Sequence, residues 1–369
     1  MNRHLGKRAV VAAALLSGLG GSGCAAINVR MDRFVLGQKA RLVLSQELTF
    51  EPGAPLPFSS PEDLERLSRP SQPLRVTLAP LSRHRLGDST LTQEELTFPS
   101  EHSLRYPEAN VGRAYVFRQG ELGARPVLLW VPGQNVSEGD FLSLDGYFRR
   151  ALSAGFDVVF YVPPYHLERT PRAFGSGDAF LATAFPDHLM AFAQELCDLR
   201  GLVAWLRARG VQELGAFGGS MGATMVLRLI TWEPLFDFVT VMQPLLDWVA
   251  LLRQPEMAPV LSRLRAQGLS NEEIVRVYQA VDPRDGKPRI SASRICLLYG
   301  RYDQLAQEGP LLSLKRLWGI RRVTAYERGH AFISLGSRPF HDLSESLRVD
   351  RGALEFHRRL AQRPAPPAR

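Results

Sequence analysis

The sequence predicts an α/β protein built on a doubly wound, mostly parallel sheet. Between about residues 91 and 361, short continuous apolar runs alternate with longer segments of helical periodicity. Continuous apolar runs indicate strands that are buried on both faces, as in a parallel sheet covered by helices. The chain has 369 residues, of which 45% are hydrophobic and 22% charged, so it can bury a sizeable core without disulfides.

The strands are expected where β-branched and aromatic residues cluster in short runs. These runs lie at 113–118, 127–131, 158–162, 214–217, 238–242, 294–299 and 323–326. Helices are expected at 143–154, at 188–209 and directly after Ser220. In the 188–209 segment, apolar residues recur in alternating steps of three and four, which places them on one helix face. They are Leu189, Phe192, Leu196, Leu199, Val203 and Leu206.

The segment before this domain is less regular. We expect residues 27–90 to form an N-terminal extension, with a helix at 31–48 and a proline-rich irregular stretch at 52–73 around a short helix at 62–68. The tail at 362–369 contains only Arg, Pro and Ala after Gln362 and is expected to be disordered.

Residues 245–287 interrupt the alternation of strands and helices. They have a helical pattern and are unusually long for a connection between two strands. We expect them to form a cap over the functional site. The alternative is a set of ordinary surface helices with no role in substrate access.

The N-terminus, residues 1–26, has the layout of a secretory signal peptide: a basic start, an apolar stretch at 9–19 and a patch of small residues. The apolar stretch is too short for a stable membrane-spanning anchor. Cys24 resembles the acylated cysteine of a bacterial lipoprotein signal, although Gly21 stands where that pattern prefers leucine. This resemblance implies a periplasmic or outer-membrane lipoprotein. Cleavage near 25–26 without a lipid and an uncleaved anchor are the alternatives.

Composition argues against several other classes of function. The formal net charge is +8, but the arginines are scattered and lysine is scarce, so no nucleic-acid partner is expected. We expect no metal and no cofactor, because closely spaced His and Cys ligands and a phosphate-binding glycine loop are missing. Cys197 and Cys296 lie in apolar patterns and are expected to be buried thiols.

The most informative motif is Gly218-Gly219-Ser220-Met221-Gly222, which follows an apolar strand run and precedes a helical segment. This order of strand, sharp turn, serine and helix is the nucleophile elbow of serine hydrolases. The turn strains the backbone of the serine and leaves no room for side chains beside it, so it needs glycine. Ser220 is therefore the predicted nucleophile.

A serine nucleophile needs a base, and the base needs a carboxylate to orient it. Asp303 and His330 each follow a predicted strand, at the edge of the sheet where such sites are built, and they have the expected chain order. Alternatively, Asp303 caps a following helix and His330 is a surface histidine. Asp282 and His166 are rivals for the two roles, but Asp282 precedes its strand.

Two backbone amides must stabilise the negative oxygen of the tetrahedral intermediate. The Met221 amide is expected to be one, because it opens a helix whose dipole favours negative charge. The Gln134 amide, in the loop after the 127–131 strand, is the candidate for the other. Tyr165 and His166 follow the 158–162 strand and are candidates to line the substrate pocket.

Over about 270 residues the chain resembles the α/β-hydrolase superfamily, with Ser220, Asp303 and His330 matching its triad. Many members carry His-Gly or His-Gly-Gly-Gly where this chain has Pro132-Gly133, which leaves the second oxyanion donor open. Short motifs are similar to alpha/beta hydrolase domain-containing protein 18: Pro61-Glu62-Asp63-Leu64, Pro163-Pro164-Tyr165 and Ser220-Met221-Gly222. The resemblance implies an acyl-ester hydrolase whose substrates could include lipids.

The sequence thus favours a secreted serine hydrolase that cleaves small-molecule or lipid esters through an acyl-enzyme. If Cys24 is acylated, its lipid would also attach the protein to a membrane. An acyltransferase or a peptidase could use the same triad. A catalytically silent α/β-hydrolase fold that serves as an envelope lipoprotein is the alternative from another class of protein.

Overall fold

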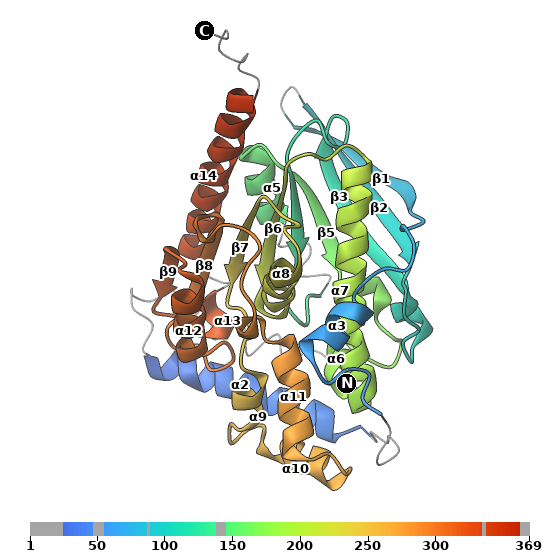
Figure 1. Ribbon diagram of the computed structural model, residues 1–369, viewed down its shortest axis with the longest axis vertical. Helices are drawn as coiled ribbons and strands as arrows, with labels where there is room; N and C mark the ends of the chain where they lie inside the picture. Colours follow the sequence, from blue (N-terminus) through green and yellow to red (C-terminus); the bar gives the residue numbers. More distant parts are fainter. Residues whose placement is uncertain (1–24, 47–54, 87–88, 138–144, 334–336, 362–369) are drawn as a thin grey trace, which may run out of the picture.

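The computed structural model describes residues 25–46, 55–86, 89–137, 145–333 and 337–361, and the signal segment up to Cys24 and the tail at 362–369 lie outside these ranges. A nine-stranded sheet forms the centre of the molecule, in the order β1-β2-β3-β5-β4-β6-β7-β8-β9 (Figure 1). The strands are β1 (Thr77–Leu86), β2 (Ser89–Pro99), β3 (Val111–Gln119), β4 (Val127–Val131), β5 (Asp157–Val162), β6 (Leu214–Gly219), β7 (Phe238–Met242), β8 (Ile295–Gly300) and β9 (Arg322–Tyr326).

The sheet is parallel from β5 through β4 to β9, and antiparallel from β1 through β2 and β3 to β5. Strands β4, β5 and β7 are buried at every position, as their continuous apolar sequences predict. The predicted fold class, a doubly wound and mostly parallel α/β architecture, is confirmed.

Helices cover both faces of the sheet, and side chains alternate between them along each strand. On β5, Val159 and Tyr161 belong to the core on one face, whereas Val158, Phe160 and Val162 belong to the core on the other. The first face is covered by α7 (Phe185–Ala208), α8 (Ser220–Trp232) and α12 (Glu308–Trp318); the second is covered by α5 (Asp145–Ser153) and α14 (Ser337–Ala361).

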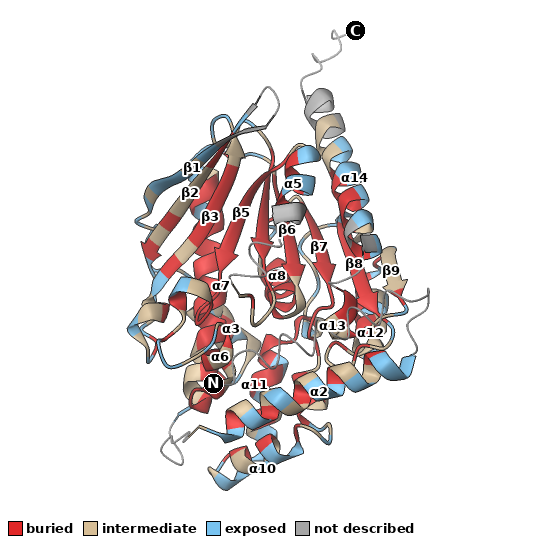
Figure 2. Ribbon diagram, turned by 180° about the vertical axis from the view of Figure 1, so that it is seen from behind, coloured by how far each residue is buried: buried red, intermediate tan, exposed pale blue. Residues whose placement is uncertain are grey.

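Helix α7 is buried on more than the one face that its periodicity predicts. Its ribbon is coloured as buried over most of its length (Figure 2), and its polar residues Gln194 and Glu195 are as buried as its leucines. The reason is an outer layer: α3 (Pro61–Leu67) and Leu74 pack over the side of α7 that faces away from the sheet. A Cβ on Gly201 would come 2.7 Å from Leu74, so this packing is close.

The N-terminal part of the chain contributes more to the sheet than the sequence predicts. β1 and β2 extend the sheet by a hairpin, and the expected boundary at residue 90 falls inside this hairpin. β1 is difficult to predict from the sequence because it contains Pro80, and proline is disfavoured in strands except at edges and bulges. β1 is the edge strand, and its register with β2 shifts between Pro80 and Ser82.

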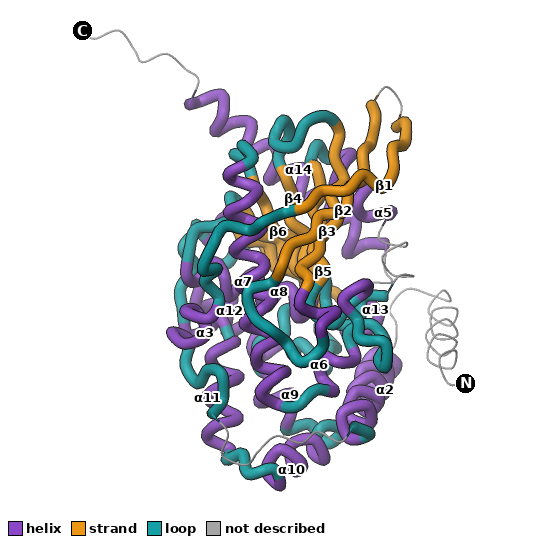
Figure 3. Tube along the Cα trace, turned by 90° about the vertical axis from the view of Figure 1, so that its right-hand side faces the viewer, coloured by secondary structure: helices purple, strands orange, loops and turns teal. Residues whose placement is uncertain are grey.

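Several helices gather at one end of the molecule, beside the carboxyl ends of the parallel strands (Figures 1 and 3). The segment predicted as a cap forms three of them, and the others come from the N-terminal part and from the connection before α7. No helix among the described residues is long and apolar enough to cross a bilayer. The helices gathered at this end include α2 (Ala25–Leu44), α6 (Asp178–Ala182), α9 (Trp248–Leu252), α10 (Ala258–Ala266) and α11 (Asn271–Val281).

Candidate functional site

Ser220 stands at the sharp turn between β6 and α8. Its φ of +50° is in the left-handed region that non-glycine residues rarely adopt. The turn also brings neighbouring backbone segments very close together. A Cβ on Gly218 would come 2.6 Å from Ala223 Cα, and one on Gly222 would come 2.4 Å from the Pro132 carbonyl oxygen. The glycines that the motif supplies at these two positions are therefore required by the turn.

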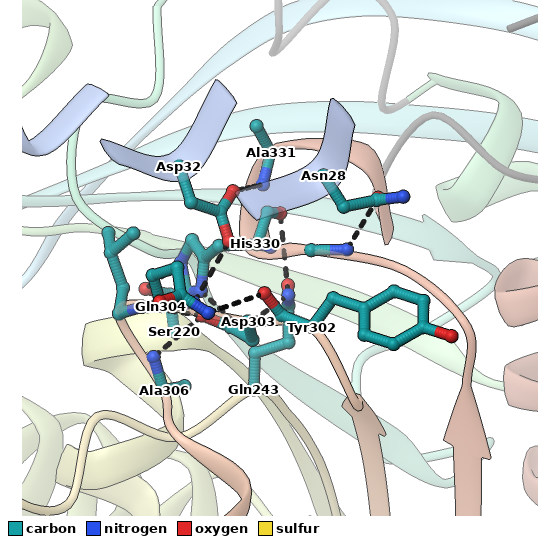
Figure 4. Close-up of polar contacts among 12 residues, drawn as sticks. Asn28, Asp32, Ser220, Gln243, Tyr302, Asp303, Gln304, Ala306, His330 and Ala331 are labelled. Carbon is teal, nitrogen blue, oxygen red and sulfur yellow. Dashed lines mark hydrogen bonds and ion pairs between the residues drawn. The ribbon is translucent and has the colours of Figure 1, made fainter. Parts of the chain in front are cut away.

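The structure brings the three predicted polar residues together. Ser220 Oγ lies 2.9 Å from His330 Nε2, and His330 Nδ1 lies 2.7 Å from Asp303 Oδ2 (Figure 4). His330 begins the short helix α13 (His330–Ile333) after β9, and Asp303 follows β8. A hydroxyl, an imidazole and a carboxylate from three separate connections thus form one hydrogen-bonded chain.

The Asp303 carboxylate is buried and fully engaged. Oδ1 accepts hydrogen bonds from the Leu305 and Ala306 amides at 2.8 and 2.7 Å, while Oδ2 faces His330. Asp303 therefore accepts these bonds within a tight turn and does not cap a helix, because the next helix, α12, begins only at Glu308. These amides hold the carboxylate so that one oxygen remains for the imidazole.

Gln243 also supports Asp303, although no motif in the sequence points to it. It follows β7, and its Nε2 donates to Asp303 Oδ2 at 2.8 Å and to the His330 carbonyl oxygen at 3.3 Å. Its φ of +53° is again left-handed. The only signal in the sequence is its place directly after a buried strand, at the edge where the other site residues lie.

Helix α2 contributes two further residues that sequence reasoning missed. Asp32 Oδ2 accepts hydrogen bonds from the amides of His330 and Gln304 at 2.8 and 3.0 Å, and Oδ1 accepts one from Ala331 at 3.0 Å. Asn28 Oδ1 accepts a hydrogen bond from the Gly329 amide at 2.7 Å. Both side chains are buried, although a polar residue in a helix pattern normally marks the solvent face.

Electrostatics favour the protonated form of His330. Burial alone would lower the pKa of this imidazole, but the charge of Asp303, its hydrogen bond and the charge of Asp32 together raise the pKa above the ordinary value. Burial, with the nearby charge of Asp303, also raises the pKa of Asp32. His330 is therefore placed to take up a proton from Ser220.

The loop after β4 lies directly against Ser220. A Cβ on Gly133 would come 2.9 Å from Ser220 Cβ. The Asn135 amide is occupied, since it donates to His166 Nε2 at 2.9 Å, and Lys39 Nζ donates to the Asn135 side-chain oxygen. The Gln134 amide remains the candidate donor from this loop, opposite the Met221 amide at the start of α8.

Tyr165 and His166 do not line the apolar cavity that reaches the site. His166 is buried, and both ring nitrogens have partners, because Nδ1 lies 2.8 Å from the Pro164 carbonyl oxygen while Nε2 faces Asn135. Burial lowers its pKa to about 4, so it stays neutral and braces the loop. The Tyr165 ring packs edge-on against Tyr106. The rival acid, Asp282, stands at the C-terminal end of α11 and forms an ion pair with Arg284.

A cavity with mostly apolar walls reaches the connections that carry the site, although neither Ser220 nor His330 is among its lining residues. Three of its residues belong to connections that carry the site: Gln134, Leu245 and Leu305. Its remaining walls come from α2, from the connection before α7, from the first turn of α7 and from the 245–287 helices. These walls include Leu36, Lys39, Val43, Leu181, Thr183, Phe185, His188, Trp248, Leu251, Leu252, Met257, Val260, Leu264, Gln267 and Tyr278.

Two polar atoms on these walls have no hydrogen-bond partner in the described part of the chain: Thr183 Oγ1 and Trp248 Nε1. His188 differs, because it faces the Phe180 carbonyl oxygen and the Tyr278 hydroxyl, and burial lowers its pKa to about 4. Nowhere in the described ranges do three or more His, Cys, Asp or Glu side chains group closely enough to hold a metal ion.

No family model and no curated protein matches this chain. Solved structures do resemble it. Acetyl xylan esterase 1 from Thermoanaerobacterium sp. JW/SL YS485 aligns with a TM-score of 0.57 and 17% identity, over 85% of this chain and 98% of that one. For an acetyl xylan esterase from Paenibacillus sp. R4 the values are 0.56 and 14%, with the same coverage. An S-formylglutathione hydrolase from Agrobacterium tumefaciens aligns at 0.50 and 16%, over 73% and 98%. These likenesses, with the sheet topology, show the α/β-hydrolase fold.

Proposed function

We propose that this protein is a serine hydrolase that cleaves carboxylic esters through an acyl-enzyme intermediate. The observation that carries the proposal is the hydrogen-bonded chain from Ser220 through His330 to Asp303, with contacts of 2.9 and 2.7 Å. In this proposal Ser220 is the nucleophile, His330 the base and Asp303 the group that orients the imidazole. The strained turn at Ser220 presents its hydroxyl at the rim of the sheet.

The reaction proceeds in two halves. Ser220 Oγ attacks the ester carbonyl carbon while His330 Nε2 takes the hydroxyl proton, and the Met221 and Gln134 amides stabilise the oxyanion. The intermediate collapses as the alkoxide leaves with the proton from His330, so the acyl group stays on Ser220. Water then gives a proton to His330 and attacks the acyl-enzyme. Collapse of the second intermediate releases the carboxylic acid and restores Ser220.

The cavity supports an ester with a substantial apolar part. Its walls are formed mainly by leucine, valine and aromatic side chains. Thr183 Oγ1 and Trp248 Nε1 lack partners there, and a buried polar atom without a partner is costly. We therefore infer that the substrate also brings a polar group, which would accept a hydrogen bond from one or both of these side chains.

The test is hydrolysis of p-nitrophenyl esters from acetyl to palmitoyl by the wild type and by Ser220→Ala. We expect the wild type to prefer esters whose acyl chain is long enough to enter the cavity, and Ser220→Ala to lose at least about 10³-fold in kcat. A fluorophosphonate probe should label the wild type and not the variant. Folded wild-type protein that neither turns over any ester nor reacts with the probe would contradict the proposal, and would favour the catalytically silent alternative.

We also propose that the protein is exported and attached to a membrane through a lipid on Cys24. The signal-like pattern of residues 1–26 supports this, as does the outer surface of α2, where Ile27 and Phe34 are exposed beside several exposed arginines. Lipid on Cys24 should place wild-type protein in the membrane fraction and add the mass of acyl chains. Cys24→Ser should appear in the soluble fraction without that mass, and equal membrane binding of both proteins would refute the anchor.

A further inference from the structure

Helix α2 contacts three connections of the proposed site: the one that contains His330, the one that contains Asp303, and the loop after β4. Asn28 and Asp32 bind the connection that contains His330, and Asp32 also binds the one that contains Asp303, at the Gln304 amide (Figure 4). About two turns further along the helix, Lys39 binds Asn135 in the loop that holds Gln134. At the far end of α2, Arg263 of α10 donates to the carbonyl oxygens of Val43 and Leu44.

Asp32 is the centre of this arrangement. Its side chain is fully buried and accepts three backbone hydrogen bonds, from Gln304, His330 and Ala331. Hydrogen bonds from amides to a carboxylate are stronger than those between neutral groups. One carboxylate therefore ties the backbone next to Asp303 to the backbone of His330.

We propose that Asp32 is a positioning residue of this site: its carboxylate holds the His330 and Asp303 connections at the separation that the Ser220–His330–Asp303 chain needs. The inference rests on the proposed serine hydrolase activity and adds to it a residue from outside the predicted catalytic domain. Asp32 does not touch the reacting atoms. It acts through the backbone of His330 and through its charge.

The variant Asp32→Asn distinguishes a positioning role of Asp32 from a role in packing alone. The asparagine has nearly the same shape, but its single amide oxygen replaces only one carboxylate oxygen, and its NH₂ group would face an amide donor. We expect kcat for a p-nitrophenyl ester to fall about ten- to a hundredfold, with little change in KM, because a small displacement of the base affects the chemical step.

The pH profile gives a second, independent readout. The charged groups that act on His330 are Asp303, Asp32 and Lys39, and the first two favour its protonated form. Removal of the Asp32 charge should lower the pKa of His330, so the acidic limb of kcat/KM should move to lower pH in Asp32→Asn. Asp32→Glu keeps the charge but displaces the carboxylate, so its kcat should fall while the acidic limb stays near that of the wild type.

Gln38→Ala, at an exposed position of the same helix, is the matched control and should behave as the wild type. Asp32→Asn with a kcat within about twofold of the wild type and an unmoved acidic limb would overturn the inference. Failure of both Asp32 variants to fold would assign Asp32 to the fold and also overturn it. An inactive wild type would instead refute the proposed function, so the two failures are distinguishable.

Discussion

At the end of β7, the backbone of Gln243 is strained while its side chain makes a directed contact. Its φ is +53°, and its Nε2 donates to Asp303 Oδ2 at 2.8 Å. Non-glycine residues in this conformation persist only where the surroundings compel them, and they cluster at functional sites. The strain therefore has a local explanation: it directs the amide toward the carboxylate that orients His330.

Gln243→Met tests this contact, because methionine has the same unbranched length but no N–H donor. We expect kcat for ester hydrolysis to fall about tenfold with KM nearly unchanged, since a hydrogen bond to a charged group contributes about 1.5–3 kcal/mol. Gln93→Met, in β2 at the far side of the sheet, is the control and should leave both constants unchanged. Equal kcat values for Gln243→Met and the wild type would show that the amide is dispensable.

Residues with a motif were predictable, and residues without one were not. Ser220 was predictable because its turn requires glycine at positions 218 and 222, and Asp303 and His330 because each follows a strand in the expected order. Gln243 and Asp32 support those side chains through hydrogen bonds that only the folded chain creates. Tyr165 and His166 show the opposite case: they follow a strand, as predicted, but their side chains are buried in the interior and do not line the cavity.

At the level of elements, the central strands followed from their continuous apolar runs and helix α7 from its periodicity, whereas the longest helix, α14, was not predicted. The elements that the sequence described least well are those whose partners are distant in the chain. β1 and β2 form an edge hairpin whose first strand contains Pro80. Helix α2 begins at Ala25, earlier than the expected residue 31, and its last expected residues lie outside the described ranges.

Helix α2 illustrates why such elements resist prediction. Its buried set mixes Asn28 and Asp32 with Leu36, Ala40 and Val43, at steps of three and four. The periodicity is regular, but two of the five members are polar, so an apolar stripe is not visible in the sequence. Their burial is explained by the backbone amides of the His330 connection, to which they supply hydrogen-bond acceptors. No local sequence pattern predicts this pairing.

For the whole molecule, the interior beside α7 carries buried charge that the fold must accommodate. Arg169 and Asp198 form a buried ion pair at 2.9 Å, and the Tyr161 hydroxyl donates to the same carboxylate oxygen. The Val162 carbonyl oxygen also accepts from Arg169. Glu195, one turn away from Asp198, is fully buried as well, but in the described part of the chain neither of its carboxyl oxygens has a hydrogen-bond partner.

This environment makes the stability of the whole protein depend on pH through Glu195. Burial raises its pKa from the model-peptide value of 4.5 to about 8, partly opposed by Arg169. The folded state therefore holds a proton that the unfolded chain releases near pH 4.5. By linkage, the contribution of Glu195 to the free energy of unfolding is fully present below pH 4.5. It falls by up to roughly 1.4 kcal/mol per pH unit as the pH rises toward 8.

Glu195→Gln keeps the shape of the protonated side chain and cannot ionise. We expect the variant and the wild type to unfold at similar denaturant concentrations at pH 5, and the variant to be more stable at pH 8.5 by on the order of a few kcal/mol. Glu62→Gln, at an exposed position of α3, is the control for loss of a carboxylate and should follow the wild type. Since Arg169 and Asp198 are unchanged in both proteins, the difference between the two pH curves isolates Glu195. Parallel curves for Glu195→Gln and the wild type would mean that Glu195 is already ionised in the folded protein, with Arg169 as the group that stabilises its charge.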